Sequence, residues 1–149
     1  MQQLVEFAGN HPYLFLALFV VTGLLIWNLI GERLSGIESL LPHEATQLIN
    51  REDAVVLDVR EESEYKQGHI LNSVHIPLST LSDKINRLEK YRNRPIIASC
   101  MTGNRSGNVC SRLKKSGFEK VYNLKGGIYG WQNANLPLTK NSGKGRITT

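Results

Sequence analysis

An uncharged apolar segment near the amino terminus constrains this chain more than any other feature of its sequence. The segment runs from Tyr13 to Ile30 (YLFLALFVVTGLLIWNLI), and no Lys, Arg, Asp or Glu interrupts it. As a helix rising ~1.5 Å per residue it would be about 27 Å long, close to the ~30 Å hydrocarbon core of a bilayer. The aromatic residues Tyr13 and Trp27 lie near its ends, as interfacial anchors do. We therefore expect one single-pass transmembrane helix at residues 13–30.

Three alternatives to a spanning helix have less support. A cleaved signal peptide needs a basic amino-terminal region and a small-x-small cleavage site. The flank at residues 1–12 contains no Lys or Arg, and Gly31 to Leu34 (GERL) offers no such site. A buried core helix normally carries a polar stripe, and an interfacial helix a charged face, whereas no face of this segment carries a charge.

The charge distribution orients the expected anchor. The formal net charge is +5, all 18 Lys and Arg follow residue 31, and Glu6 is the only acidic residue before it. Basic flanks favour the cytoplasmic side, so we expect the rest of the chain in the cytoplasm. Basic and acidic residues are interspersed there, so no nucleic-acid partner is expected. Two cysteines, Cys100 and Cys110, are too few for a disulfide scaffold and fit a reducing compartment.

Strands and helices are expected to alternate after a short polar linker at residues 31–36. This alternation predicts parallel strands with right-handed crossovers, hence an α/β fold with helices on both faces of a sheet. The domain is expected to span residues 37–140, followed by a disordered polar tail at 141–149. The pattern predicts strands at 54–59, 73–77, 95–99 and 121–124, and helices at 43–50, at 81–88 with Ser79 as N-cap, at 106–116, and from Gly126 through Trp131.

The most informative local stretch is IIASCMTGNRSG, from Ile96 to Gly107. A buried strand runs into a short loop that begins at Cys100 and leads straight into a helix. Ligands of open parallel sheets bind at the carboxyl ends of strands, where this cysteine is expected. The N–H groups of the loop, the helix amino terminus and Arg105 would all favour a thiolate. The pKa of Cys100 should therefore fall below the ordinary ~8.5, which makes this residue the candidate nucleophile.

This loop and four further motifs, in their order along the chain, resemble the rhodanese family. The resemblance covers about residues 37–138 and, with the preceding anchor, is similar to the rhodaneses of the bacterial inner membrane. It implies a rhodanese-like five-stranded parallel sheet flanked by helices. The motifs are Asp58-Val59-Arg60, Glu64-Tyr65-x-x-Gly68-His69-Ile70, Ser73-Val74-x-Ile76-Pro77, the loop from Cys100 to Arg105, and Gly126-Gly127 before Trp131.

The resemblance implies a sulfurtransferase that works through a Cys100 persulfide. Sulfane sulfur would pass from thiosulfate or a persulfide donor to a thiol or cyanide acceptor. The expected partners are a small sulfur donor, a thiol acceptor or protein persulfide carrier, and the membrane; no metal or organic cofactor is required. The side chains between Cys100 and Arg105 carry no charge, which argues against efficient use of the thiosulfate dianion. The expected substrate-binding residues are Met101, Thr102, Gly103, Asn104 and Arg105.

Several further polar residues and the second cysteine are expected to have structural rather than catalytic roles. Asp58, Arg60 and Glu64 are expected to form a supporting charge cluster near the carboxyl edge of the sheet. His69 is expected to be hydrogen bonded rather than a general base, and Cys110 to lie in the core. The scattered histidines show no metal-ligand spacing.

Two other functions stay open at this stage. The same fold would also serve as a non-catalytic, membrane-tethered docking module, although the intact cysteine argues against it. A Cys-plus-Arg loop also occurs in Cys-dependent phosphatases and arsenate reductases. Here Met101 to Asn104 separate Cys100 from Arg105, one residue fewer than in related phosphatases, whose longer loop accommodates a tetrahedral oxyanion.

Overall fold

The computed structural model describes the backbone of residues 12–34 and 36–140, and the side chains of residues 13–26 and 36–140. The chain divides into two compact units, Met1–Gly36 and Ile37–Thr149. The expected amino-terminal flank, apart from Pro12, and the expected disordered tail at 141–149 lie outside the described residues.

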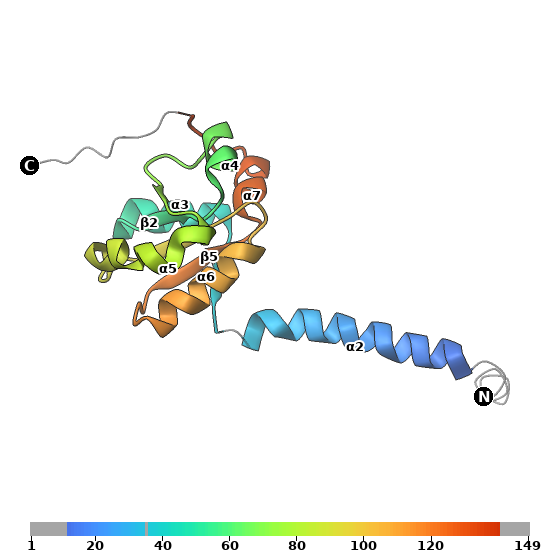
Figure 1. Ribbon diagram of the computed structural model, residues 1–149. Helices are drawn as coiled ribbons and strands as arrows, with labels where there is room; N and C mark the ends of the chain where they lie inside the picture. The colour runs from blue at the N-terminus through green and yellow to red at the C-terminus, as the bar shows by residue number, and fades with distance from the viewer. Residues whose placement is uncertain (1–11, 35, 141–149) are drawn as a thin grey trace, which may run out of the picture. The chain divides into compact units, whose positions relative to one another are not determined.

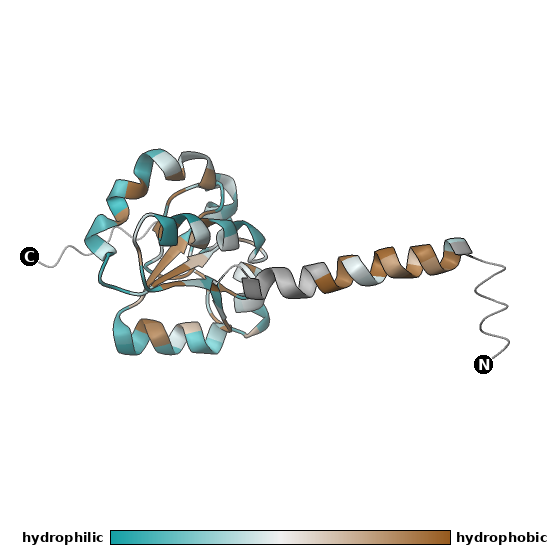
Figure 2. Cartoon of the chain, turned by 90° about the horizontal axis from the view of Figure 1, so that it is seen from below, coloured by the Kyte–Doolittle hydropathy of each residue, from teal (hydrophilic) through white to brown (hydrophobic). Residues whose placement is uncertain are grey.

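The first unit contains the helix α2 (Pro12–Leu34). Its described apolar side chains are largely exposed, among them Leu16 at 68%, Phe19 at 74% and Leu24 at 65%. Figure 2 shows the hydrophobic colour over most of the part of this helix whose side chains are described. Among the residues that the structure describes, no helix is both long enough and apolar enough to cross a membrane. The transmembrane helix at residues 13–30 therefore stays a prediction.

A five-stranded sheet forms the centre of the second unit (Figure 1). Its strands lie in the order β1-β5-β4-β2-β3, and all neighbouring strands pair in parallel. The strands are β1 (Glu38–Leu40), β2 (Val55–Asp58), β3 (Val74–His75), β4 (Ile96–Ser99) and β5 (Val121–Leu124). The helical segments are α3 (Pro42–Glu52), α4 (Glu62–Gln67), η1 (Leu78–Thr80), α5 (Leu81–Lys84), η2 (Ile85–Tyr91), α6 (Asn104–Lys115) and α7 (Gly127–Asn133).

Two hydrophobic clusters fill the two faces of the sheet. Successive residues of a strand point to opposite faces, so Ile96 of β4 packs in one cluster and Ile97 in the other. The first cluster takes side chains from α5, η2 and α6, and the second takes them from α3 and α7. Helices therefore cover both faces, as the alternating pattern of the sequence predicted.

The edge strand β1 is absent from the strands that the sequence pattern predicted. It has three residues and one buried side chain, Leu40, which is too short to show an alternating pattern. Pairing with β5 holds it in place, and the Lys125 N–H donates to the Leu40 carbonyl at 2.8 Å. It supplies the fifth strand that the family resemblance implied.

The prediction of one continuous helix at residues 81–88 is wrong, because this segment is divided between α5 and the 3₁₀ helix η2, and a second 3₁₀ helix, η1, precedes it. Ser79 is not its cap: Thr80 occupies the N-cap position of α5, and the Ser79 hydroxyl lies 3.4 Å from Oε2 of Glu61. The apolar spacing still identified buried residues, since Leu81 and Leu88 lie in the core. Elsewhere, α6 begins at Asn104 rather than two residues later.

Candidate functional site

Cys100 lies at the carboxyl end of β4, where the chain leaves the sheet between β2 and β5. Residues 101–103 form a short loop, and α6 follows directly, with Gly103 in the N-cap position. The Cys100 side chain is fully buried. The predicted nucleophile therefore lies at the edge of the sheet where parallel α/β folds bind their ligands.

Hydrogen-bond donors surround the Cys100 sulfur. The Gly103 N–H donates to Sγ at 3.1 Å, and the Ser106 hydroxyl donates to it at 3.4 Å. Burial by itself raises the pKa of this thiol, but the Ser106 hydroxyl and the N–H groups of Ser106, Thr102 and Gly103 outweigh it. The pKa of Cys100 is consequently below its ordinary value. The site favours the nucleophilic thiolate.

Ser106 and Asn123 take part in this site although the sequence analysis did not select them. The Ser106 Oγ lies 2.7 Å from Asn123 Oδ1 and 3.1 Å from the Gly103 carbonyl oxygen. A hydroxyl has one proton, so ionisation of Cys100 favours donation to the charged sulfur over these neutral oxygens. Asn123 also donates from Nδ2 to the Gly103 carbonyl at 3.1 Å. The sequence offered two signals for these residues. Ser106 directly follows the loop arginine, and Asn123 is a polar residue within a short strand.

The amino-terminal end of α7 holds the loop from a second side. The N–H groups of Ile128 and Tyr129 donate to the carbonyls of Cys100 at 2.9 Å and Met101 at 3.1 Å. Gly127 has a φ of +55°, and a Cβ at this position would collide with the Cys100 carbonyl oxygen. Glycine permits the close approach that fixes the backbone of the loop.

The uncharged side chains of the loop differ in exposure. Met101 is partly buried and packs against the second core cluster, whereas Thr102 and Asn104 are exposed. Gly103 has a φ of +99°, and a Cβ there would lie 3.2 Å from a backbone oxygen of β5. The loop places these residues around Cys100, and their predicted role in substrate binding stays a prediction.

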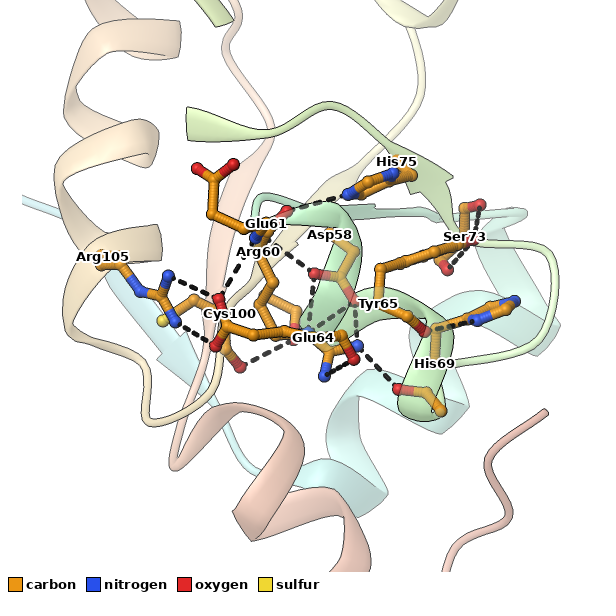
Figure 3. Close-up of polar contacts among 12 residues, drawn as sticks. Asp58, Arg60, Glu61, Glu64, Tyr65, His69, Ser73, His75, Cys100 and Arg105 are labelled. Atoms are coloured by element: carbon orange, nitrogen blue, oxygen red, sulfur yellow. Dashed lines mark hydrogen bonds and ion pairs between the residues drawn. The ribbon is translucent and has the colours of Figure 1, made fainter. Parts of the chain in front are cut away.

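The cation of the loop, Arg105, forms an ion pair with Glu64 of α4 (Figure 3). Its Nη1 donates to Oε2 of Glu64 at 2.9 Å, and its Nη2 donates to Oε1 at 2.7 Å. The pKa of Glu64 is lowered, chiefly by these hydrogen bonds. The pKa of Arg105 is raised, first by Glu64 and to a smaller extent by the Cys100 sulfur. Arg105 therefore faces the nucleophile with its charge already compensated.

Asp58 and Arg60 form a separate, buried ion pair at the end of β2. Nη2 of Arg60 lies 2.7 Å from Oδ2 of Asp58. The guanidinium also donates to the carbonyl oxygens of Glu64 at 3.2 Å and Gly68 at 2.8 Å, which fixes the backbone of α4. The sequence analysis predicted that Glu64 would belong to this cluster. In the structure the Glu64 carboxylate is bound to Arg105 instead, and only the Glu64 backbone carbonyl accepts a hydrogen bond from Arg60.

The second cysteine lies in the core, as the sequence predicted. Cys110 is fully buried within α6, and its thiol donates to the Tyr122 carbonyl at 3.3 Å. Burial raises the pKa of Cys110 to about 12. Both cysteines are free thiols.

The histidines near the site have structural contacts. The Tyr65 ring stacks on His69 at 3.8 Å and on His75 at 4.1 Å between ring centroids. Nδ1 of His69 lies 3.1 Å from the Tyr65 carbonyl, and Nε2 of His75 lies 2.8 Å from the Arg60 carbonyl. Among the described residues, no group of three or more His, Cys, Asp or Glu side chains could hold a metal ion.

Comparison with known proteins matches residues 41–134 to the family model of the Rhodanese-like domain. The uncharacterized protein YibN of Escherichia coli is 33% identical over 141 residues, which cover 94% of this chain and 99% of YibN. The thiosulfate sulfurtransferase GlpE of Coxiella burnetii is 33% identical over 89 residues, which cover 60% of this chain and 81% of GlpE. A rhodanese-related protein from Thermoplasma volcanium has a similar solved structure, with a TM-score of 0.64 and 32% identity over 70% of this chain and 99% of that one.

Proposed function

This chain belongs to the rhodanese family, and from that premise we propose that it is a sulfurtransferase whose Cys100 carries the transferred sulfur as a persulfide. The observation that carries the proposal is the set of donors around Sγ, from Gly103 at 3.1 Å and Ser106 at 3.4 Å. These donors favour the thiolate, which is the reactive form of a cysteine. The GlpE relative, named a thiosulfate sulfurtransferase, supports the same class of reaction.

The proposed reaction has two covalent steps. The Cys100 thiolate attacks the outer sulfur of a donor, thiosulfate or a persulfide. The donor S–S bond breaks, and its electron pair leaves with sulfite or with the donor thiolate. A cyanide or thiol acceptor then attacks the outer sulfur on Cys100 and restores the thiolate. The N–H groups that stabilise the thiolate also stabilise the persulfide anion, because the negative charge stays within the same loop.

We also propose that the apolar segment at residues 13–30 tethers the domain to the cytoplasmic side of a bacterial inner membrane. Support comes from the uncharged sequence, from the basic residues that follow it, and from the exposure of apolar side chains such as Leu16 and Phe19 in α2. Membrane fractionation should recover the uncleaved chain, and protease added outside spheroplasts should spare the domain. Release of a shortened, periplasmic form would contradict both parts of this proposal.

Intact mass spectrometry of the full chain in detergent tests the sulfurtransferase proposal. After incubation with thiosulfate, the mass should rise by one sulfur atom, and cyanide should remove that atom as thiocyanate. Absence of the adduct and of thiocyanate with both thiosulfate and a persulfide donor would favour a docking module. Hydrolysis of an aryl phosphate instead would favour a phosphatase.

A further inference from the structure

The Glu64–Arg105 ion pair sets the charge that a sulfur donor meets at Cys100. Resting on the proposed sulfurtransferase function, we propose that Glu64 is a specificity-determining residue. By compensating Arg105, it selects monoanionic persulfides over the thiosulfate dianion as sulfur donors.

The geometry of the pair supports full charge compensation. Two parallel hydrogen bonds of 2.9 and 2.7 Å join the guanidinium to the carboxylate, the arrangement that holds an arginine most firmly. The Glu64 carboxylate also accepts the Glu61 N–H at 3.2 Å, so it is fixed from its own helix as well. The two side chains are 26% and 38% exposed, which reduces the screening of the pair by salt.

Among the described residues, the loop after Cys100 and the helix α4 supply no unpaired cation that could replace Arg105. The loop side chains from Met101 to Asn104 are uncharged. The charge of Arg60 is compensated by Asp58 within the protein. The α4 segment adds further carboxylates, because Glu61 precedes the helix and Glu62 begins it, although Glu62 is paired with Lys66 at 2.6 Å. The charged group of α4 that contacts Arg105 is the Glu64 carboxylate, and Figure 3 shows the two side chains meeting beside Cys100.

The charge balance of the two donor reactions explains the selection. Thiosulfate brings two negative charges to the thiolate, and the reaction yields the Cys100 persulfide anion and the sulfite dianion. A persulfide R–S–S⁻ brings one negative charge, and the reaction yields the same Cys100 persulfide anion and R–S⁻. Uncompensated, Arg105 would stabilise the more highly charged encounter more strongly, because Coulomb attraction scales with the product of the charges. When Glu64 balances the charge of Arg105, Arg105 loses most of its preference for the thiosulfate dianion.

The test is the Glu64→Gln variant, assayed in the full chain with thiosulfate and with 2-hydroxyethyl persulfide, whose organic group is uncharged, as alternative donors. Glutamine keeps the size of the side chain and, through its amide oxygen, an acceptor for the Glu61 N–H. It removes the negative charge and one of the two oxygens that accept from Arg105. We expect kcat/KM for thiosulfate to rise about tenfold relative to kcat/KM for the persulfide. The gain should shrink as ionic strength increases. Glu62→Gln is the matched control on the same helix, and it should leave the ratio of the two donors unchanged.

The complementary variant is Arg105→Gln, which leaves Glu64 uncompensated and should lower the thiosulfate-to-persulfide ratio; it keeps the inference testable if Glu64→Gln fails to fold. An unchanged donor ratio in the folded Glu64→Gln protein, or an equal change in Glu62→Gln, would overturn the inference. A wild-type protein that turns over neither donor would instead overturn the proposed function itself.

Discussion

Cys100 and Cys110 are both fully buried and pack in the same hydrophobic cluster, yet their thiols differ in acidity. Cys110 lies within α6 and donates to a carbonyl oxygen, and burial raises its pKa to about 12. Cys100 lies where β4 ends; burial raises its pKa too, but hydrogen bonds from Ser106, Thr102 and Gly103 bring it below the ordinary value. Burial is common to both residues, so the direction of the surrounding N–H and O–H groups is what separates the lowered pKa of Cys100 from the raised pKa of Cys110.

Replacing each cysteine in turn should give the largest difference in sulfur-transfer activity. Cys100→Ser should reduce sulfur transfer roughly a thousandfold or more, because a hydroxyl is far less acidic than a thiol and forms no persulfide. Cys110→Ser should stay within about threefold of wild type, since its side chain lies away from the loop. Thiocyanate formation from thiosulfate and cyanide measures both variants, with mass spectrometry to locate the sulfur. Equal activity in wild type and Cys100→Ser would leave the docking module as the better interpretation.

The pH dependence of alkylation should separate the two thiols in the unmodified protein. The thiolate fraction rises as pH increases through the pKa of each group. The rate at which iodoacetamide modifies Cys100 should therefore reach its plateau at a lower pH than the rate for an ordinary thiol does. Modification of Cys110 should begin only in strong alkali. At neutral pH we expect roughly a hundredfold or greater preference for Cys100, measured by peptide mass spectrometry. Parallel pH profiles for the two cysteines would contradict the comparison.

Removing one hydrogen-bond donor to the Cys100 sulfur should raise the pKa of Cys100 toward that of Cys110. Ser106→Ala should raise the pKa of Cys100 and slow transfer at neutral pH about tenfold, because a hydrogen bond to a charged group is lost. The alkylation profile and the thiocyanate assay measure the two effects. Ser111→Ala is the matched control on the same helix, since that hydroxyl donates to the Gly107 carbonyl at 3.3 Å and does not contact the sulfur. Equal effects of the two substitutions would mean that the Ser106 hydroxyl has no special role.

The smallest effect is expected for Asn123→Ala. Asn123 contacts the Ser106 hydroxyl and the Gly103 carbonyl rather than the sulfur, so its loss should reduce kcat about threefold with little change in KM. The Asn108→Ala control replaces an exposed asparagine of α6 and should have no effect on either constant. A loss as large as that of Ser106→Ala would show that the two residues act as one unit.

Cys100 could be selected from the sequence as the candidate nucleophile because all the signals for it are local. The buried run before Cys100, the glycine in the loop and the arginine at its end lie within one strand-loop-helix junction. The partner of Arg105 was not predictable in this way, because Glu64 lies 41 residues earlier and its carboxylate meets the arginine only after β2 and β4 have paired. Sequence proximity instead suggested that Glu64 joins Asp58 and Arg60.

The same distinction applies to the fold. The strands β2 and β4 are buried along their whole length and appear in the sequence as runs of three apolar residues followed by Asp58 and Ser99. The strand β1 has a single buried side chain, so its pairing with β5 is decided by tertiary contacts rather than by pattern. The spacing of Leu81 and Leu88 identified a buried face correctly, but apolar spacing alone does not distinguish an α-helix from the 3₁₀ turns that surround α5.

The close approach of Gly127 to the Cys100 carbonyl oxygen leaves no space for a Cβ, so position 127 should tolerate no substitution. Gly127 performs no chemistry, but every side chain larger than hydrogen would displace the loop that orients the N–H groups around the sulfur. In a saturation-mutagenesis survey scored on sulfur transfer, Gly127 should therefore be as intolerant as Cys100. A survey scored on protein abundance should penalise even Gly127→Ala, whereas it should tolerate the small replacements Cys100→Ser and Cys100→Ala. The two positions would look equally essential by activity, and only the abundance measurement would reveal which of them supplies the reactive atom.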